Sequence, residues 1–270
     1  GWHLECSAMS CKYLGEQFDI HGGGMDLVFP HHEAEIAQCC AANNNKGAKY
    51  WMHNNMITIG GQKMGKSLGN FITLSEFFKG DHEKLAQSYH PMVIRFFLLQ
   101  AHYRSTVDFS NEALQAAEKG LIRLFNAMKT LSELNSHEKS TIDVLLYTSK
   151  CEQAMNDDLN TPIVLSYLFE LAKLINSTKQ GENKLSKQDI HQLIDLFEKY
   201  VINIFGLQPI QKFKSKDSDS GNLMQLLLEL RNQAKDTKDW VTADKIRNDL
   251  NNLNIEIKDT KDGTKWSYKK

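Results

Sequence analysis

One pentapeptide in the first quarter of the chain has the residue types needed to bind phosphate groups. Lys63-Met64-Gly65-Lys66-Ser67 carries two lysines three positions apart, and it follows an apolar stretch that ends at Gly60-Gly61. This pattern predicts a glycine-containing loop. Two ammonium groups on one loop can clamp a polyphosphate and offset the charge that builds on a leaving pyrophosphate. Basic loops are often only solvated, so the pentapeptide alone leaves both interpretations open.

A second group of residues has metal-ligand chemistry. His31 and Glu35 are four positions apart on a predicted helix, so they share one face. With Cys6 they offer thiolate, imidazole and carboxylate, all of which bind zinc. The alternative is a buried cysteine beside a solvated His–Glu face. His32 and Glu33 lie between the two candidates and compete as ligands.

The C-terminal segment has residue types that suit a nucleic acid. Trp240 could stack on an unpaired base, and Lys235 could donate a hydrogen bond to one. Asp244 and Asp259 could accept hydrogen bonds from base amino groups. A core tryptophan and a helix-capping aspartate are the competing interpretation.

These groups need elements to position them. Residues 18–21 read as a strand ended by Gly22-Gly23-Gly24, where a backbone can approach a ligand closely. Pro30 predicts a helix start with a helix over 31–42, and 56–59 reads as another strand. Strand–helix–strand order indicates the end of a parallel α/β sheet, whose remaining strands we expect upstream.

The rest of the chain is predicted to be mostly helical. Apolar residues recur at helical spacing over 113–134, and further runs at about 140–157, 162–178 and 186–205 complete a bundle. Residues 211–222 have the composition of a linker. Helices over 223–235 and 240–253, then a hairpin, form a small terminal unit. We expect five segments: 1–72, 73–110, 111–207, 208–222 and 223–270.

Bulk composition sets outer limits. The 270 residues carry a formal net charge of −1, which argues neither for nor against a nucleic-acid partner. No apolar run approaches the ~20 residues of a membrane span, so no membrane association is expected. Five cysteines without a disulfide pattern indicate a reducing cytoplasm. The abrupt start at Gly1-Trp2-His3 reads as the middle of a larger protein.

Together the motifs resemble cysteinyl-tRNA synthetase of the bacterial type, a class I aminoacyl-tRNA synthetase. Lys63–Ser67 followed by Leu68-Gly69-Asn70-Phe71 is similar to the second signature of that class, KMSKS, with Gly65 where serine is usual. The resemblance extends over essentially the whole chain. It is carried by GWHLECSAM at 1–9, FDIHGGGMDL at 18–27, FPHHEAEIAQ at 29–38, WMH at 51–53, RFF at 95–97, YRS at 103–105, MNDDLNTP at 155–162, KDW at 238–240, AD at 243–244 and GTKW at 263–266.

The resemblance implies a fold that is α/β plus all-α. Residues 1–72 would be the C-terminal part of a Rossmann-like catalytic domain. A helical connector, an anticodon-binding bundle and a small mixed α/β anticodon-recognition subdomain would follow. It implies a monomer that uses ATP with Mg²⁺ and L-cysteine, and tRNA(Cys) as partner.

The resemblance also implies roles for single residues. Cys6, His31 and Glu35 would be three of four ligands of a zinc ion that binds the substrate thiolate, since thiolate suits zinc better than a hydroxyl does. Trp2, His21 and Asp26 would line the cysteine pocket. ATP would contact Gly23, Gly24 and the loop residues Lys63, Met64, Gly65, Lys66 and Ser67, with Lys63 and Lys66 catalytic. Lys235, Trp240, Asp244 and Asp259 would read the anticodon. Gly65 is expected to loosen the loop.

Two family features are not in this sequence. The first signature, HIGH, and the fourth zinc ligand, a cysteine ahead of it, are expected upstream. The 270 residues alone are therefore expected to hold zinc weakly or not at all and to be inactive. Two alternatives remain. One is a non-catalytic tRNA-binding fragment, and the other is the related ligase that joins cysteine to an amino-sugar inositol in thiol biosynthesis.

Overall fold

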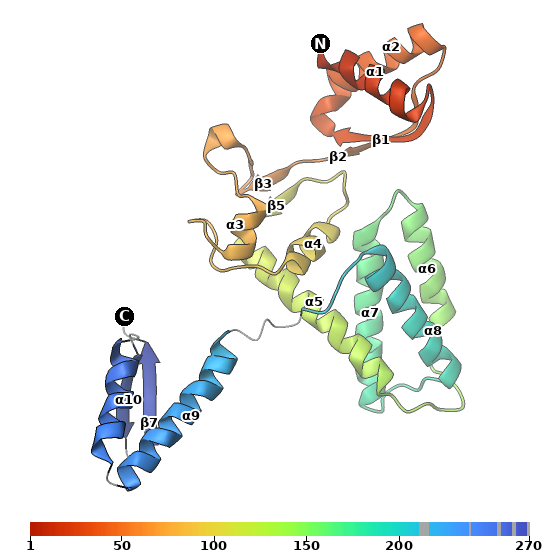
Figure 1. Ribbon diagram of the computed structural model, residues 1–270. Helices are drawn as coiled ribbons and strands as arrows, with labels where there is room; N and C mark the ends of the chain where they lie inside the picture. Colours follow the sequence, from red (N-terminus) through yellow and green to blue (C-terminus); the bar gives the residue numbers. More distant parts are fainter. Residues whose placement is uncertain (211–215, 238, 253–254, 261–262, 269–270) are drawn as a thin grey trace. The chain divides into compact units, whose positions relative to one another are not determined.

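The computed structural model describes residues 1–210, 216–237, 239–252, 255–260 and 263–268 (Figure 1). The chain forms two compact units, Gly1–Pro209 and Ile210–Lys270. Each unit has its own core. No helix in the described ranges is long and apolar enough to cross a membrane.

The first unit begins with a parallel strand–helix–strand arrangement. Strand β1 (Phe18–Gly24) pairs in parallel with β2 (Ala48–Asn54), and α2 (Glu33–Asn43) connects them. The predicted strand at 18–21 is therefore longer than expected. Gly22, Gly23 and Gly24 do not end it, because they continue the ladder opposite Met52, His53 and Asn54.

The helices around β1 also differ from the sequence prediction. Two short helical turns, η1 (Met25–Leu27) and η2 (Val28–His32), follow β1, so the regular helix α2 begins at Glu33 rather than at His31. Phe29 has extended backbone angles, φ −129° and ψ 133°, which break the helical path there. Helix α1 (Trp2–Leu14) packs against α2.

A second small sheet carries the candidate phosphate loop. Strand β3 (Ile57–Ile59) pairs antiparallel with β4 (Gln62–Lys63) and parallel with β5 (Val107–Phe109). The predicted strand at 56–59 thus belongs to a different sheet from β1, and the parallel partner of β1 is β2. Gly60 and Gly61 make the β3–β4 turn with φ of 59° and 77°, angles that favour glycine.

Helices occupy most of the remaining first unit. The short η3 (Lys66–Leu68), α3 (Leu74–Lys79) and α4 (Pro91–Leu99) lie between β4 and β5 in the chain, and α5 (Asn111–Ser132) packs on α4 and α7. The bundle continues with α6 (Val144–Asn156), α7 (Thr161–Lys179), α8 (Lys187–Phe197) and η4 (Glu198–Ile204).

The bundle core follows from helical periodicity. In α5, within the predicted helical run, Leu114, Leu121 and Leu124 are fully buried, as are Ala117 and Ala127. In α7 the buried positions include Val164, Leu168, Leu171 and Ile175. These spacings of three and four residues place apolar side chains on one face, as predicted.

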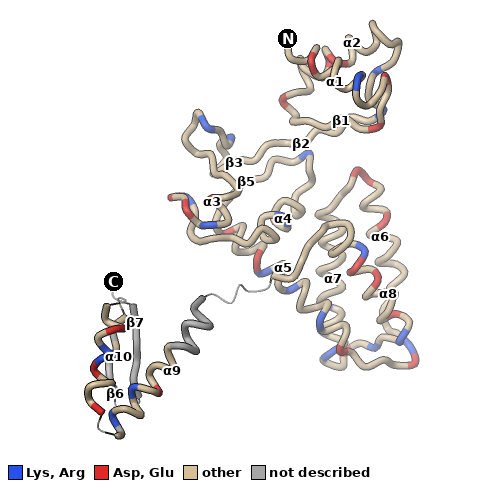
Figure 2. The backbone as a smooth tube through the Cα atoms, viewed as in Figure 1, with Lys and Arg blue, Asp and Glu red and all other residues tan. Residues whose placement is uncertain are grey.

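The second unit has two helices and a hairpin. Helix α9 (Lys216–Asp236) begins inside the segment predicted as linker. Helix α10 (Trp240–Asn252) and the antiparallel strands β6 (Ile255–Thr260) and β7 (Gly263–Tyr268) follow. Figure 2 shows both charge signs along α10, so that helix has no single-sign surface.

Candidate functional site

The three candidate metal ligands come together in the structure. Cys6 on α1, His31 before α2 and Glu35 on α2 each present a ligand atom, and these atoms lie within 4.8 Å of one another. His31 and Glu35 are buried, at 5% and 3% exposure. Helix α2 supplies the last ligand and α1 lies against it, so the packing of two helices builds the cluster.

The geometry of this cluster fits a shared ligand better than an internal hydrogen bond. His31 Nε2 and Glu35 Oε1 are 2.8 Å apart, yet Glu35 Oε1 has no hydrogen-bond partner in the described structure. His31 Nδ1 is likewise buried without a hydrogen bond among the described residues. Buried polar atoms normally have partners. An unpartnered carboxylate oxygen beside an imidazole nitrogen and a thiol is a set of atoms that suits a zinc ion.

The electrostatics of the cluster point the same way. Burial raises the pKa of the Glu35 carboxyl. The pKa of the Cys6 thiol is raised by burial and then by the nearby Glu35 and Glu5 carboxylates. Ionised Cys6 and Glu35 repel each other at this distance, and a bound cation would offset that repulsion.

A second ligand group shares Glu35. His21, His32 and Glu35 also place ligand atoms within 4.8 Å of one another. Burial and the neighbouring histidines lower the pKa of His32 to about 4, so its imidazole is neutral at neutral pH. Glu33, the other competing candidate, is exposed and belongs to neither group.

An aromatic and histidine wall lies beside the cluster. Trp51 stacks on His21 with ring centroids 4.5 Å apart, and His53 Nε2 lies 2.7 Å from His32 Nδ1. In the sequence, Trp51 and His53 belong to a motif of the family resemblance but have no predicted role. Their signal was alternation, since residues two apart on a strand share one face of the sheet.

The three predicted pocket residues separate into two places. Trp2 stacks on His31 at 3.6 Å between ring centroids, and His21 lies 3.6 Å from Glu35, so both border the ligand cluster. Asp26 instead pairs with Lys63, Nζ to Oδ2 3.6 Å. Gly24, Asp26 and Lys63 line one small cavity of about 140 Å³.

Asn70 holds the phosphate loop in shape. Gly65 N–H donates to Asn70 Oδ1 at 2.9 Å, and Asn70 Nδ2 donates to the Lys63 carbonyl at 3.1 Å. Gly65 itself has φ −160°, extended backbone that any residue adopts, so its conformation does not require glycine. The Lys66 ammonium lies over the Phe71 ring, 5.5 Å from its centroid.

Comparison with known proteins assigns the family. Residues 1–119 match the family described as tRNA synthetases class I (C) catalytic domain, and residues 150–209 match the DALR domain. Over the whole chain, cysteine–tRNA ligases from Parabacteroides distasonis and Bacteroides fragilis are each 57% identical, and the one from Chlorobaculum tepidum is 45% identical. The chain belongs to the cysteine–tRNA ligase family.

The chain spans about half the length of these curated relatives, 55% in each case. A leucyl-tRNA synthetase from Agrobacterium radiobacter K84, solved as a ternary complex with tRNA, resembles the structure with a TM-score of 0.51 at 14% identity. That likeness covers 69% of this chain and 26% of the leucyl enzyme, and it concerns the fold. The predicted architecture is confirmed at this level: class I catalytic segments followed by a DALR helical domain.

In this member of the cysteine–tRNA ligase family, the His32 ring lies against the backbone of β1 at Gly23. A Cβ on Gly23 would lie 2.5 Å from His32 Cε1, so Gly23 is needed for the ring to sit there. A Cβ on Gly24 would meet only the end of the Asp26 side chain, which can move. The space beside Gly23 is thus already occupied by the His32 ring of the same chain.

The four predicted anticodon residues lie in the second unit. Trp240 is 59% exposed at the start of α10, so the core alternative for this residue is wrong. Asp244 is exposed in the middle of α10, and the helix cap is Asp239, whose Oδ1 accepts from Thr242 N–H at 3.1 Å. Lys235 lies in the last turn of α9. The side chain of Asp259 is outside the described residues.

Proposed function

We propose that this chain forms the zinc-bearing and tRNA-binding part of a cysteine–tRNA ligase. The reaction is ATP-dependent activation of L-cysteine to cysteinyl-adenylate, then transfer of the cysteinyl group to the 3′ end of tRNA(Cys). The observation that carries the proposal is the convergence of Cys6 on α1, His31 on η2 and Glu35 on α2. Family membership alone would not require these side chains to meet.

Cys6, His31 and Glu35 would hold the zinc ion, and a fourth ligand would come from the rest of the protein. Bound zinc would bind the thiolate of L-cysteine, which a serine hydroxyl replaces poorly. The indole of Trp2, stacked on His31, would orient that ligand and exclude water from one side. His21, stacked on Trp51, would form the opposite wall of the amino-acid pocket.

Lys63 and Lys66 would bind the phosphates of ATP, which enters with Mg²⁺ as substrate. Lys63 must first leave Asp26, and this is easy because both side chains are more than half exposed. Exposed ion pairs are worth only about 0–1 kcal/mol. Asp26 would then be free for the substrate ammonium group, while Gly23, Gly24, Met64, Gly65 and Ser67 offer backbone groups to the nucleotide.

The helical bundle and the second unit would bind tRNA(Cys). The exposed indole of Trp240 supports stacking on an unpaired base, and the exposed Asp244 supports base recognition from the same helix. Lys235 and Asp259 complete the proposed anticodon set. The proposed protein acts as a monomer in the cytoplasm.

A metal-binding measurement tests the proposal. The chain is titrated with Co²⁺ at neutral pH, with thiolate-to-cobalt absorption as the signal. Three protein ligands should give weak binding, and Cys6→Ser should remove the thiolate band entirely. Cys40→Ser, at an exposed cysteine, is the matched control and should leave the band unchanged. A thiolate band that survives Cys6→Ser would contradict the proposed ligand set.

Activity of the 270 residues alone provides a second test. They lack the HIGH signature, so we expect no cysteine-dependent exchange of pyrophosphate into ATP. Robust exchange would contradict this division of the active site.

A non-catalytic tRNA-binding role is the second candidate for the isolated chain. It is favoured by Trp240, an aromatic side chain exposed on a small terminal unit. Binding of tRNA(Cys) and of an unrelated tRNA should be compared at one stated salt concentration. Equal affinities would remove the anticodon role. The ligase of thiol biosynthesis is disfavoured, since it has no use for this terminal unit.

A further inference from the structure

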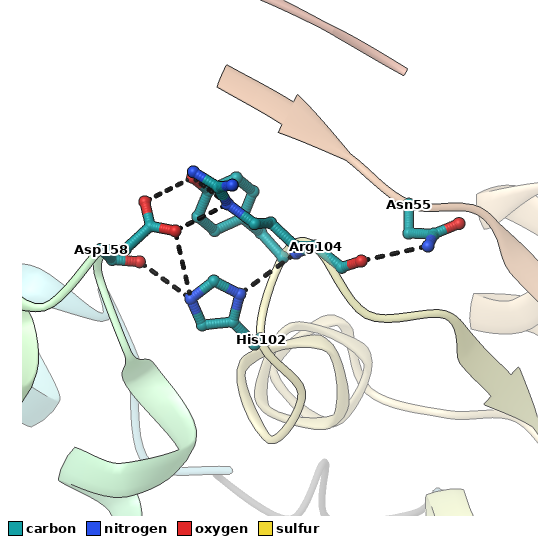
Figure 3. Close-up of polar contacts among 5 residues, drawn as sticks. Asn55, His102, Arg104 and Asp158 are labelled. Atoms are coloured by element: carbon teal, nitrogen blue, oxygen red, sulfur yellow. Dashed lines mark hydrogen bonds and ion pairs between the residues drawn. The ribbon is translucent and has the colours of Figure 1, made fainter. Parts of the chain in front are cut away.

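A polar cluster joins the two family-matched parts of the first unit. It involves Asn55 in the catalytic match, the turn His102-Tyr103-Arg104 near the end of that match, and Asp158 in the DALR match. Figure 3 shows Asp158 reaching the turn from one side, with Asn55 meeting the turn from the other. The proposed function gives none of these residues a task.

On one side, the turn is bound by Asp158. The Tyr103 hydroxyl donates to its carboxylate at 2.6 Å, and Arg104 Nε lies 2.6 Å from Oδ2. His102 Nε2 lies 2.9 Å from the Asp158 backbone oxygen. The hydrogen bond from Tyr103, followed by the charge of Arg104, lowers the pKa of Asp158, so the carboxylate is ionised at neutral pH.

On the other side, the same turn is bound by Asn55. Asn55 N–H donates to the Tyr103 carbonyl at 2.8 Å, and Asn55 Nδ2 donates to the Arg104 carbonyl at 3.0 Å. Asn55 lies between β2, which carries Trp51 and His53, and β3, which leads into the phosphate loop. The turn is therefore hydrogen-bonded to the short segment that connects the two strands.

The backbone at Asp158 is held in an uncommon conformation. Asp158 and Leu159 both have φ of 56°, in the left-handed region that side chains with a Cβ rarely adopt. Such a conformation persists where surrounding contacts enforce it. Here those contacts are the ones to the turn, together with Thr161 Oγ1, which donates to the Leu99 carbonyl at 2.8 Å.

The polar cluster of Asn55, His102, Tyr103, Arg104 and Asp158, here named the joint, also borders the proposed nucleotide site. His102, Tyr103, Asn55 and Leu159 line a cavity of about 760 Å³ that reaches Gly22 and Gly23 on β1. Asn55 lines the smaller cavity of Asp26 and Lys63 as well. One residue of the joint thus faces both spaces.

We propose that Asp158 is a positioning residue that transmits tRNA binding on the helical bundle, through the turn 102–104 and Asn55, to β2, β3 and the phosphate loop. The inference rests on the proposed function for the identity of tRNA as the ligand. The coupling itself rests on the contacts above. A rigid chain of charged and backbone hydrogen bonds can carry such a shift because each contact has few alternative arrangements.

Hydrogen exchange of the full chain tests this, with transcribed tRNA(Cys) as the probe. In the wild type, tRNA should slow amide exchange over residues 55–69. Asp158→Asn and Asp158→Gly should bind tRNA with an unchanged Kd but lose that slowing. Both variants tolerate positive φ, and glycine relieves the backbone while it removes the carboxylate, so either serves if the other folds poorly.

Glu152→Gln is the matched control. It is the same kind of change, six residues earlier on α6, and it removes an ion pair with Lys199 that stays within the bundle. It should behave as the wild type. Slowing that persists in both Asp158 variants, or that is absent from the wild type although tRNA binds, would overturn the proposal.

A second arm needs no tRNA. In the free chain, Asp158→Asn should speed exchange of the Asn55 amide by about tenfold. The reason is that Asn55 N–H donates to the Tyr103 carbonyl, and Asp158→Asn removes the charged hydrogen bond that holds Tyr103. In the double variant Asp158→Asn/Asn55→Ala, the loss of free energy that protects the residue-55 amide from exchange should be smaller than the sum of the losses in the two single variants. Failure of tRNA to bind would count against the proposed function, whereas unchanged Asn55 exchange would overturn the joint.

Discussion

At the scale of single residues, the phosphate loop depends more on Asn70 than on its glycine. The Asn70 side chain bonds both ends of the turn, at Lys63 and at Gly65, and is 6% exposed. A side chain that accepts from one backbone group and donates to another closes a loop in the way a backbone turn does. The glycine found where the family signature has serine therefore leaves the loop geometry intact.

Gly65→Ser is expected to be nearly neutral. A Cβ at this position would meet only Leu68 at 3.8 Å, an ordinary contact, and the backbone is extended. The free energy of unfolding, measured by urea denaturation, should change by less than about 0.5 kcal/mol.

Gly80→Ser is the control for that experiment. Gly80 has φ 71°, and a Cβ there would lie 2.6 Å from Ser88 N, so this change should destabilise the chain by at least about 1 kcal/mol. Equal effects at the two positions would mean that Gly65 is constrained in a way the loop geometry does not show.

At the scale of elements, the helix after the phosphate loop is held at its start by a capping box. The Thr73 hydroxyl oxygen accepts from Glu76 N–H at 3.2 Å, and Glu76 Oε2 accepts from Thr73 N–H at 2.7 Å. The hydrogen bonds from Thr73 lower the pKa of Glu76, so the carboxylate that completes the box is ionised at neutral pH. Helix α3 has six residues, too few to persist without such support.

Thr73→Ala should therefore loosen α3. The loss of an N-cap costs about 1 kcal/mol, which hydrogen exchange should detect as faster exchange over residues 74–79. Thr106→Ala, at an exposed threonine outside the helices, is the comparison and should leave α3 unchanged. If both changes act alike on α3, the cap does not hold this helix.

At the scale of the whole molecule, the two units differ greatly in core size. The first unit contains the fully buried side chains of the bundle, such as Leu121 and Leu168. The second has a core of Met224, Leu250, Ile255 and Ile257, with three partly buried neighbours. A unit of about 60 residues buries a small share of its surface, so it should be the less stable of the two.

Leu250→Ala and Leu121→Ala should separate the two units experimentally. Each should cost about 2–5 kcal/mol because each leaves a cavity in a buried core. In urea, hydrogen exchange should show Leu250→Ala destabilising only α9, α10 and the hairpin, and Leu121→Ala only the bundle. If either variant destabilises both units equally, they unfold as one cooperative body.

The sequence alone determined the features that depend on local spacing and residue type. The i, i+4 relation of His31 and Glu35, the pair of lysines in the phosphate loop and the apolar stripe of α5 could all be read directly, because helical period and side-chain chemistry are local properties. Family resemblance then favoured a zinc site for Cys6, His31 and Glu35 over the structural alternative.

Tertiary structure decided the contacts between residues far apart in the chain. The pairing of β1 with β2 placed Trp51 opposite His21, and the sequence prediction had instead grouped β1 with the strand at 56–59. The clamp by Asn70 and the joint from Asp158 to Asn55 depend on register and on packing across more than one element. Periodicity contains no information about such distances, because many folds share the same local pattern.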